Sequence, residues 1–325
     1  MSYKASVIIT GGTINLGYYA ALEIARAHPD YLVVISSRSD RKHAADTINK
    51  TLGQANTVYI PLDLANLQNV RQYAEDWAAK KHPPIQALLL NAGLQFPGPV
   101  SKTVDGLEST FAINYVGHAL LFHLLLPYLA PKARVIVTSS GTHDPEQTKG
   151  TGFPQPAYIS AEELAHPTSA SASNPGRQRY AESKLANVLW TYALHRRLRQ
   201  QPAAAERGIT VNAFDPGLMP GTGLAREASA PSRFVWLHIL PRLIPLMRLL
   251  LSPNIHTARE SGANLARLAI DPDVEGESGV YYEGPKPIRT SELSYEEAKQ
   301  EDLWRWTVDY LAKGDQERER FEQLK

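Results

Sequence analysis

The sequence predicts an α/β protein built on a doubly wound parallel sheet of the Rossmann type, with about seven strands. Two observations predict this fold class. Short runs rich in Val, Ile and Leu, as expected for strands covered on both faces, alternate with longer helical patterns. In addition, a glycine-rich turn directly follows the first run, which is where such sheets carry their phosphate-binding loop.

The expected strands, in chain order, are Ser6–Thr10, Tyr31–Ser36, Thr57–Pro61, Ala87–Asn91, Arg134–Ser139, Thr210–Phe214 and Gly279–Tyr282. Helical patterns follow most of them, at Tyr18–Ala27, Leu67–Lys80, Gly106–Leu129, Arg179–Gln200 and Thr257–Ile270. Because crossovers between parallel strands are right-handed, the carboxyl ends of the strands should lie along one edge of the sheet. Ligands bind at that edge in open α/β sheets.

Bulk properties limit the classes of function. The 325 residues contain no Gly/Ser-rich or charged linker, which favours one domain over residues 1–325. The net charge of +1 argues against nucleic-acid binding. The lack of cysteine excludes disulfides, thiolate nucleophiles and cysteine metal sites, and we expect no metal. Residues 1–4 lead straight into an apolar run, so we expect no signal peptide and a cytoplasmic protein.

The glycine-rich turn spans Thr10–Gly17, between the first strand and the first helix. Its glycines would let the backbone approach a pyrophosphate, and the helix N-terminus would supply N–H donors. The expected contacts are Gly11, Thr13, Asn15, Leu16 and Gly17. Asn15 stands where a glycine would be expected, but asparagine tolerates a positive φ better than most residues. The alternative is an ordinary glycine-rich turn between a strand and a helix.

The end of the second strand carries basic residues where a carboxylate would hold the ribose of NAD. Ser37 and Arg38 are followed closely by Arg41 and Lys42. A guanidinium suits a 2′-phosphate through bidentate geometry, so Ser37, Arg38 and Lys42 predict NADP(H) as the cofactor. The alternatives are that Arg41 and Lys42 are solvated charges at a helix start and that Asp40 caps this helix.

Two turns farther along the chain fit the same site. Asp63-Leu64 ends the third strand, where a carboxylate can accept a hydrogen bond from the adenine amine. Asn91-Ala92-Gly93 ends the fourth strand, where small residues let the adenosine ribose lie close to the backbone. Each is a common turn composition by itself, and their order and spacing after the glycine-rich turn give them weight.

Tyr180 and Lys184 form the candidate proton-transfer pair. Four Tyr/Lys pairs have this spacing, and only this one opens a long amphipathic segment downstream of a strand that ends in Thr138-Ser139-Ser140. Residues four apart share one face of a helix, so the phenol can be aligned with an ammonium and a serine hydroxyl. The alternatives are that Tyr180 is a half-buried core aromatic and that the serines simply bond the turn.

Together these residues resemble the short-chain dehydrogenase/reductase family. The resemblance runs from Thr10 to about Leu224, and more weakly to about Tyr282. It rests on seven ordered elements: Thr10–Gly17, Asn91-Ala92-Gly93, Asn114, Ser140, Tyr180, Lys184 and Asp215-Pro216-Gly217. Within the family, the stretches Ile113–His118 and Pro216–Leu224 look like the branch that holds retinol dehydrogenases and protochlorophyllide reductases.

The sequence departs from the family pattern at three points. Asn15 replaces the middle glycine, Ile14 stands where the family has a basic residue, and the pigment-site cysteines of light-dependent protochlorophyllide reductases are missing. The NADP(H) preference therefore rests on Arg38, and we do not expect photochemistry.

The resemblance implies hydride transfer between a nicotinamide and a carbonyl or alcohol carbon. Tyr180 would donate the proton in reduction and accept it in oxidation. The ammonium of Lys184 would lower the pKa of that phenol and hold the nicotinamide ribose. Ser140 would bind the substrate oxygen. Asn114 would hold a water next to Lys184, although it could also be an ordinary polar residue of its helix.

The resemblance also assigns the turn after the sixth strand to the nicotinamide. The backbone at Pro216 and Gly217 would flank the carboxamide, and the hydroxyl of Thr222 would bond to it. Capping of the next helix is an equal alternative for Thr222.

An insert, residues 141–179, separates Ser140 from Tyr180. It is rich in Pro, Gly, Ser and Thr, with a possible small helix at Ser160–Ala165. The insert could cover the Tyr/Lys helix and prevent subunits from pairing there, so a monomer is favoured and a dimer remains possible. Its aromatic residues Phe153 and Tyr158 are candidates for the substrate entrance.

An apolar segment and a helical tail complete the chain. Within the lid segment 225–255, residues 233–252 are markedly apolar, but proline and arginine interrupt them too often for a membrane span. We expect a lid over a large apolar pocket, with shallow membrane docking as the alternative. The tail 284–325 is an acidic helical extension in which Trp304 and Trp306 would pack.

The sequence therefore predicts an NADP(H)-dependent reductase of a bulky lipophilic ketone or aldehyde. This small molecule is the expected partner, with possible peripheral membrane contact through 233–252. An alternative is a non-catalytic NADP(H)-sensing protein, against which the intact Ser140/Tyr180/Lys184 set counts. A pigment reductase is disfavoured by the missing cysteines. Fold alone would not choose among these functions.

Replacing Arg38 with Ala tests the cofactor assignment. The change should weaken NADPH binding by at least about tenfold and leave NADH binding almost unchanged, because only NADPH carries the 2′-phosphate. Calorimetric titration with each nucleotide measures the two losses. Arg41→Ala is the matched control and should change both affinities little. Equal losses for NADPH and NADH in Arg38→Ala would rule out this assignment.

Overall fold

The computed structural model describes residues 3–223 and 229–325, and a single sheet lies at its centre. The sheet has eight strands in the order β3-β2-β1-β4-β5-β6-β7-β8. Their bounds are β1 Ala5–Thr10, β2 Tyr31–Ser37, β3 Thr57–Pro61, β4 Ile85–Leu90, β5 Leu129–Thr138, β6 Thr210–Asp215, β7 Tyr281–Glu283 and β8 Lys286–Ile288. Strands β1 to β7 are parallel, and β8 is antiparallel to β7. The strand order reverses between β1 and β4, which is where such sheets bind ligands.

The predicted strands are confirmed, and their ends are corrected by a few residues. The largest change is in β5, which begins at Leu129 rather than Arg134 because a bulge in its pairing with β4 accommodates extra residues. The eighth strand was not predicted. Its sequence Lys-Pro-Ile is too short and polar to read as a strand, and its proline is tolerated because β8 lies at the sheet edge.

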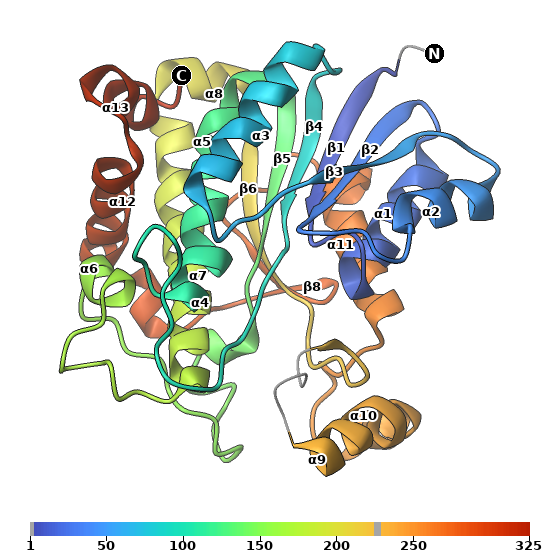
Figure 1. The fold of residues 1–325 in the computed structure, drawn as a ribbon, viewed down its shortest axis with the longest axis vertical. Coiled ribbons are helices and arrows are strands. Elements are labelled where there is room, and N and C mark those ends of the chain that lie inside the picture. Colours follow the sequence, from blue (N-terminus) through green and yellow to red (C-terminus); the bar gives the residue numbers. More distant parts are fainter. Residues whose placement is uncertain (1–2, 224–228) are drawn as a thin grey trace.

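Helices cover both faces of the sheet (Figure 1). Their bounds are α1 Asn15–Ala27, α2 Ala44–Leu52, α3 Leu67–Lys80, α4 Ser109–Phe111, α5 Gly117–Leu125, α6 Ala161–Ala165, α7 Gly176–Gln200, α8 Pro202–Arg207, α9 Ala230–Phe234, α10 Ile244–Leu250, α11 Ala258–Ile270, α12 Glu297–Leu311 and α13 Asp315–Glu322. Helices α1, α2 and α11 pack on one face, and α3, α5 and α7 on the other. An apolar core fills each interface.

The segments that end the parallel strands gather at one end of the molecule, the lower end in Figure 1. The loop after β4, the insert with α6, and helices α9 and α10 all lie there. Helix α1 starts at this end and is held tightly against α11. A Cβ on Gly262 of α11 would come within 2.5 Å of the Cβ of Tyr19, so glycine is required for this approach. The packing fixes the N-terminus of α1 against the sheet.

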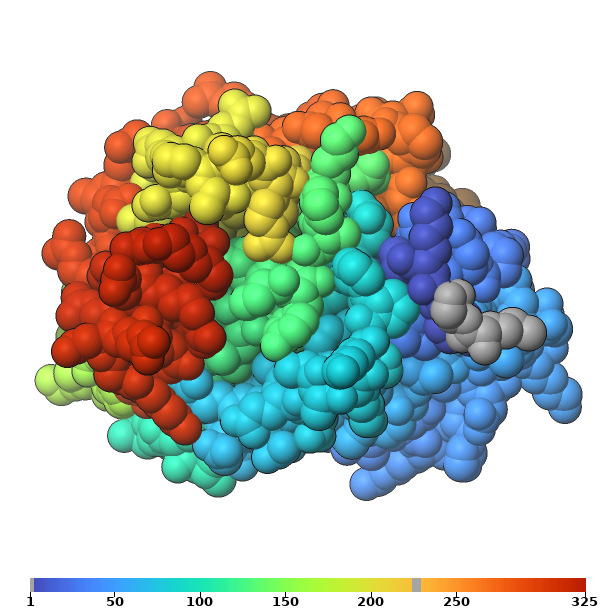
Figure 2. Space-filling model, turned by 90° about the horizontal axis from the view of Figure 1, so that it is seen from above, coloured from blue at the N-terminus to red at the C-terminus, as the bar shows by residue number. Residues whose placement is uncertain are grey.

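The C-terminal helices cover the face formed by α3, α5 and α7. Arg71 of α3 donates to both carboxylate oxygens of Glu317 in α13, each at 2.9 Å. Arg197 of α7 pairs with Glu301 of α12 at 2.5 Å. Figure 2 shows the red C-terminal residues beside the yellow residues of α7 and α8. Trp304 is buried, whereas Trp306 is only partly buried against the same core.

The insert packs against α7, whereas the two aromatic residues expected at a substrate entrance lie outside the cavity. Its turn at Gly141–His143 and helix α6 contact α7, and helix α12 packs along α7 through its apolar face. The monomer that such coverage favours stays a prediction. Tyr158 is buried, and its hydroxyl donates to Asp302 of α12 at 2.8 Å. It therefore anchors the insert to the tail and does not line a substrate entrance. Phe153 is half-buried and also lies outside the cavity that is described below.

One helical stretch of the described chain, Ser109–Tyr128, is long and apolar enough to cross a membrane, but 94% of its apolar window is buried inside the fold. It is therefore the central helix of the core. His123 lies in this helix, stacked on Phe321 with 4.5 Å between ring centroids. Neither of its ring nitrogens has a hydrogen-bond partner among the described residues. Burial lowers the pKa of His123 to about 3.

Replacing His123 with Leu should therefore make the protein more resistant to acid. The pKa of an unfolded histidine is 6.5, so the unfolded chain takes up a proton below that pH and the folded protein does not until about pH 3. Relative to the wild type, the free energy of unfolding of the variant should be higher by about 2 kcal/mol more at about pH 5 than at about pH 8. Denaturant unfolding at both pH values measures this difference. The same gain at both pH values would contradict the burial of a neutral imidazole.

Candidate active site

The glycine-rich turn after β1 forms a backbone cradle. A Cβ on Gly17 would lie 2.4 Å from the carbonyl oxygen of Gly11, so no larger residue fits there. Asn15 has a φ of 52°, the left-handed conformation that asparagine tolerates, as expected from its place in the turn. No described side chain caps α1, whose N-cap residue is Ile14. The first N–H groups of α1 are therefore available to an anion.

Thr10 joins this cradle to the end of β4. Its hydroxyl accepts hydrogen bonds from the backbone N–H groups of Asn91 at 2.8 Å and Ala92 at 2.9 Å. The side-chain amide of Asn91 donates back to the carbonyl of Thr10 at 2.9 Å. A Cβ on Gly11 would come within 3.0 Å of the Cα of Ala92. The two turns therefore form one rigid floor at the point where the strand order reverses.

A cavity of about 280 Å³ lies over this floor. The predicted cofactor residues that line it are Gly11, Thr13, Asn15, Leu16, Gly17, Ser37, Arg38, Asp63, Leu64, Asn91, Ala92, Gly93, Tyr180, Lys184, Pro216 and Thr222. Two predicted residues do not. Lys42 borders a neighbouring hollow instead. Gly217 is instead required by the turn after β6, since it has a φ of 75° and a Cβ there would come within 2.4 Å of Asn254.

Other residues of the cavity wall were not identified from the sequence. They include Ile14, Leu62, Leu94, Gln95, Ile113, Met219 and Gly223. Most are apolar, so nothing in their chemistry marks them as ligand contacts. Several are direct sequence neighbours of a predicted residue at the end of a strand. This position next to a predicted residue could have identified them from the sequence.

The end of β2 presents a cation to the cavity. Arg38 is exposed and lines it. The hydroxyl of Thr13 donates to that of Ser37 at 3.1 Å, which joins the cradle to β2. The carboxylate of Asp40 accepts the N–H of Ala44 at 2.8 Å and so caps the start of α2. This strand end therefore offers a guanidinium in the place where a free carboxylate would hold a ribose.

Tyr180 and Lys184 face the cavity from α7, where Lys184 is buried and Tyr180 is half-buried. The Lys184 ammonium donates to the carbonyl of Thr138 at 2.9 Å and lies 5.6 Å from the ring centroid of Tyr180. Burial lowers the pKa of Lys184 to about 8, although the nearby Asp215 raises it. Burial and Asp215 raise the pKa of Tyr180, and a hydrogen bond with Ser140 opposes them. The pKa of the Tyr180 phenol is thus raised, whereas the charge of Lys184 alone was expected to lower it, because desolvation is the largest contribution.

The two serines at the end of β5 differ in their contacts. The hydroxyl of Ser139 donates to the carbonyl of Lys184 at 2.9 Å and so ties β5 to α7. The hydroxyl of Ser140 accepts the N–H of Thr142 at 3.3 Å and lies close enough to Tyr180 to lower the pKa of its phenol. Ser140 is therefore the serine that reaches the phenol.

Asn114 lies in a π-helical turn, Ala112–Val116, a feature frequent at functional sites. Its side-chain amide bonds with both Leu94 and Ser183. The amide nitrogen donates to the Leu94 carbonyl at 2.9 Å and to Ser183 at 3.0 Å, and the oxygen accepts the Leu94 N–H at 2.8 Å. Ser183 donates onward to the carbonyl of Tyr180 at 2.7 Å. Both amide hydrogens are used, so only the oxygen of Asn114 could hold a water, by accepting from it.

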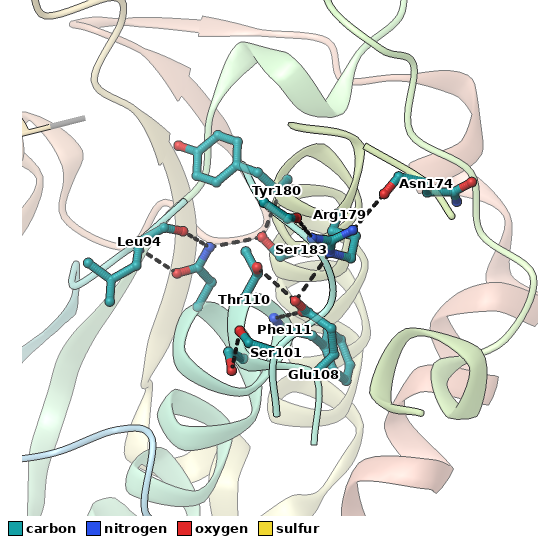
Figure 3. Close-up of polar contacts among 12 residues, drawn as sticks. Leu94, Ser101, Glu108, Thr110, Phe111, Asn174, Arg179, Tyr180 and Ser183 are labelled. Carbon is teal, nitrogen blue, oxygen red and sulfur yellow. Dashed lines mark hydrogen bonds and ion pairs between the residues drawn. The ribbon is translucent and has the colours of Figure 1, made fainter. Parts of the chain in front are cut away.

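A buried ion pair fixes the residue that precedes Tyr180. The Arg179 Nε lies 3.4 Å from a carboxylate oxygen of Glu108, and neither side chain is more than 4% exposed. The guanidinium also donates to the carbonyls of Asn174 in the insert and Gly98 in the loop after β4, at 2.6 and 2.5 Å (Figure 3). Sequence reasoning missed this pair because its members lie far apart in the chain.

Asp215 is buried behind the Tyr180/Lys184 pair at the end of β6. Its carboxylate accepts the N–H of Gly217 and the amide of Asn254, each at 2.9 Å. Burial raises the pKa of Asp215, while these hydrogen bonds and Lys184 lower it. The carboxylate therefore holds the turn after β6 and the segment before α11 in place beside the ammonium.

The polar groups of this cavity fit a dinucleotide. The cradle and the open N-terminus of α1 suit a pyrophosphate, Asp63 and Ala92 suit an adenosine, and Lys184 suits a second ribose. Within residues 3–223 and 229–325, no group of three His, Asp or Glu side chains is arranged to hold a metal ion.

Comparisons with known proteins agree with this geometry. The family model for short chain dehydrogenase matches residues 5–152. Retinol dehydrogenase 14 of Mus musculus is 31% identical over 94% of this chain and 85% of its own length. Polyprenol dehydrogenase of Homo sapiens is 29% identical over 91% of this chain and 82% of its own length. A crystal structure of an uncharacterised protein from Mycobacterium paratuberculosis superposes with a TM-score of 0.66 and 25% identity, covering 95% of this chain and 94% of its own.

Replacing Lys184 with Met tests the cost of the buried charge. The ordinary pKa of lysine is 10.5, so the unfolded chain holds this proton more tightly than the folded protein does. Burial of the charge therefore lowers the free energy of unfolding at neutral pH. This loss becomes smaller as the pH rises above about 8, where the folded protein releases the proton. The variant should gain about 1–3 kcal/mol of unfolding free energy at neutral pH. The Thr138 carbonyl keeps a partner, because Asn187 donates to it at 3.0 Å.

Denaturant unfolding at neutral and alkaline pH provides the measurement. Lys132→Met is the control, since the side chain of Lys132 is 74% exposed and its removal should change stability little. A Lys184→Met protein that is less stable than the wild type at neutral pH would show that the ammonium stabilises the fold, against this account.

Proposed function

Because the chain belongs to the short-chain dehydrogenase/reductase family of oxidoreductases, we propose that it catalyses the NADP(H)-dependent reduction of a bulky lipophilic ketone or aldehyde, or the reverse oxidation. One observation carries the proposal. The phenol of Tyr180, the ammonium of Lys184 and the hydroxyl of Ser140 meet beside a cavity with the donors for a dinucleotide.

Tyr180 is the proton donor in the proposed reduction. Its raised pKa keeps the phenol protonated at neutral pH, which is the form that a donor needs. The cofactor, when bound, supplies the hydride. Ser140 lies near the phenol, where it influences the pKa of Tyr180, and would orient the substrate oxygen beside it. The positive charge of Lys184 would stabilise the phenolate that remains after proton transfer.

The preference for NADP(H) is supported by the end of β2. Arg38 lines the cavity, and the carboxylate of Asp40 accepts a hydrogen bond from the N-terminus of α2. A guanidinium there favours the 2′-phosphate, and the engaged carboxylate leaves no competitor for it from this strand end.

The lipophilic character of the substrate is supported by the cavity wall and by the relatives. Leu94, Ile113 and Met219 contribute apolar surface to the cavity that holds Tyr180. The relatives are named for retinol and polyprenol, which are both long apolar alcohols. An apolar pocket with a few polar groups that orient the ligand is the usual form of such a site.

The proposal is tested by NADPH oxidation with a panel of lipophilic ketones, aldehydes and quinones. The Tyr180→Phe variant should lose at least roughly 100-fold in kcat because it lacks the proton donor, while its Kd for NADPH stays nearly constant. Tyr128→Phe is the matched control. Tyr128 also precedes a lysine by four residues, but it is 38% exposed and lies outside the cavity, so turnover should be unchanged.

Two outcomes would count against the proposal. Equal turnover by the wild type and Tyr180→Phe would remove Tyr180 from the chemistry. Tight NADPH binding without turnover of any member of the panel would favour the non-catalytic sensor, which needs the cavity but no proton donor.

A further inference from the structure

Residues 229–252 carry an unusual concentration of exposed apolar side chains. Of the fifteen large apolar residues that are exposed in the described chain, nine lie in this segment. They are Phe234, Val235, Leu237, Ile239, Leu243, Leu246, Leu249, Leu250 and Leu251. The leucines at the end of α10 are the most open, with exposed fractions of 81% for Leu249 and 72% for Leu251. Contiguous apolar patches on a protein surface mark interaction sites.

The outward direction of these side chains is fixed by contacts on the other side of the segment. The indole N–H of Trp236 donates to the carbonyl of Thr222 at 2.9 Å, and the N–H of Gly221 donates to the carbonyl of Trp236 at 2.9 Å. Ile244 is buried at 4% exposure. The guanidinium of Arg248 donates to the carbonyl of Ile255 at 2.5 Å. The segment is therefore anchored by one side and presents the other to its surroundings.

The charges of the segment all have one sign. No Asp or Glu occurs between Ser229 and Thr257, whereas Arg233, Arg242 and Arg248 do. Arg248 is paired with Glu260 at 2.6 Å, but Arg233 and Arg242 are exposed and close to the apolar side chains. An apolar face with cations at its border is complementary to the anionic headgroups and acyl chains of a bilayer.

We propose that residues 229–252 dock on the surface of an anionic lipid bilayer. The short helices α9 and α10 project beyond the layered body of the molecule, so a flat surface can reach them (Figure 1). A second copy of the chain is a poorer occupant, because a twofold interface on residues 229–252 would bring arginines against arginines, and these residues include no carboxylate to pair them. The interrupted segment enters only the headgroup region and does not span the membrane.

Docking would bring the mouth of the cavity to the membrane. Met219, Thr222 and Gly223 line the cavity, and the carbonyl of Thr222 is the one bound by Trp236. None of the described residues 229–252 lines the cavity, so the described part of the segment adjoins the cavity wall without forming part of it. If the proposed function holds, a lipophilic substrate could pass from the bilayer into the site without entering water. The part of the lid segment at 225–228, like Leu224, lies outside the described residues.

Flotation with vesicles tests the docking. The full-length protein should float with phosphatidylcholine vesicles that contain phosphatidylserine, and much less with phosphatidylcholine alone. Changing Leu249, Leu250 and Leu251 to Ser should lower the bound fraction at least about tenfold with both vesicles, because it removes the apolar contact. The double change Arg233→Glu and Arg242→Glu should abolish only the preference for anionic vesicles. Trp236 is left unchanged because it anchors the segment.

Two controls keep the result specific. The double variant Val104→Ser and Ile159→Ser removes exposed apolar side chains elsewhere on the chain, at 81% and 65% exposure, and should float like the wild type. All variants should retain NADPH affinity and thermal stability, which separates failure of docking from failure of the fold or of the proposed function. Wild-type protein that does not float, or floats equally well after the leucine changes, would overturn the proposal. A concentration-dependent dimer that the leucine changes dissociate would assign the face to a second copy instead.

Discussion

The burial of one lysine ammonium is the constraint on which the rest of this site depends. Lys184 is surrounded by protein, and its pKa is lowered to about 8 because the charge is poorly solvated there. Its only direct hydrogen-bond acceptor in the described chain is the carbonyl of Thr138. A buried charge with so few partners costs stability, so its retention points to a function for the charge. The phenol 5.6 Å away and the buried carboxylate of Asp215 are the groups that such a charge can influence.

The surrounding structure holds this charge and phenol in one geometry. Ser139 ties β5 to the helix that carries Lys184, and Ser183 with Asn114 ties the same helix to the loop after β4. The Arg179–Glu108 pair extends the connection into the insert. The contacts of Ser139, Asn114 and Glu108 with α7 each join segments that are distant in the chain and that meet at the same sheet edge. The ammonium and the phenol are therefore positioned by the sheet topology and not by any single loop.

Much of the site could be predicted from the sequence because its chemistry is local. A glycine turn after the first strand, a positive-φ asparagine and a Tyr/Lys pair on one helical face are each encoded within a few residues, and the structure brings them around one cavity. The contacts that were missed or misplaced are long-range. Tyr158 bonds to Asp302, and Arg179 pairs with Glu108, because folding brings together side chains that no local pattern relates. The raised pKa of Tyr180 likewise depends on burial, which spacing does not reveal.

The central claim is that the nicotinamide hydride and the proton of Tyr180 meet at one substrate carbonyl in this cavity. It is tested most directly with NADPH that carries deuterium at C4, in each of its two stereochemical forms, and a lipophilic aldehyde whose alcohol product is analysed by mass spectrometry. Because a fixed cavity exposes one face of the nicotinamide, the account predicts that deuterium from one form only appears at the carbinol carbon. Alcohol without deuterium from either form, or labelled equally by both, would contradict it.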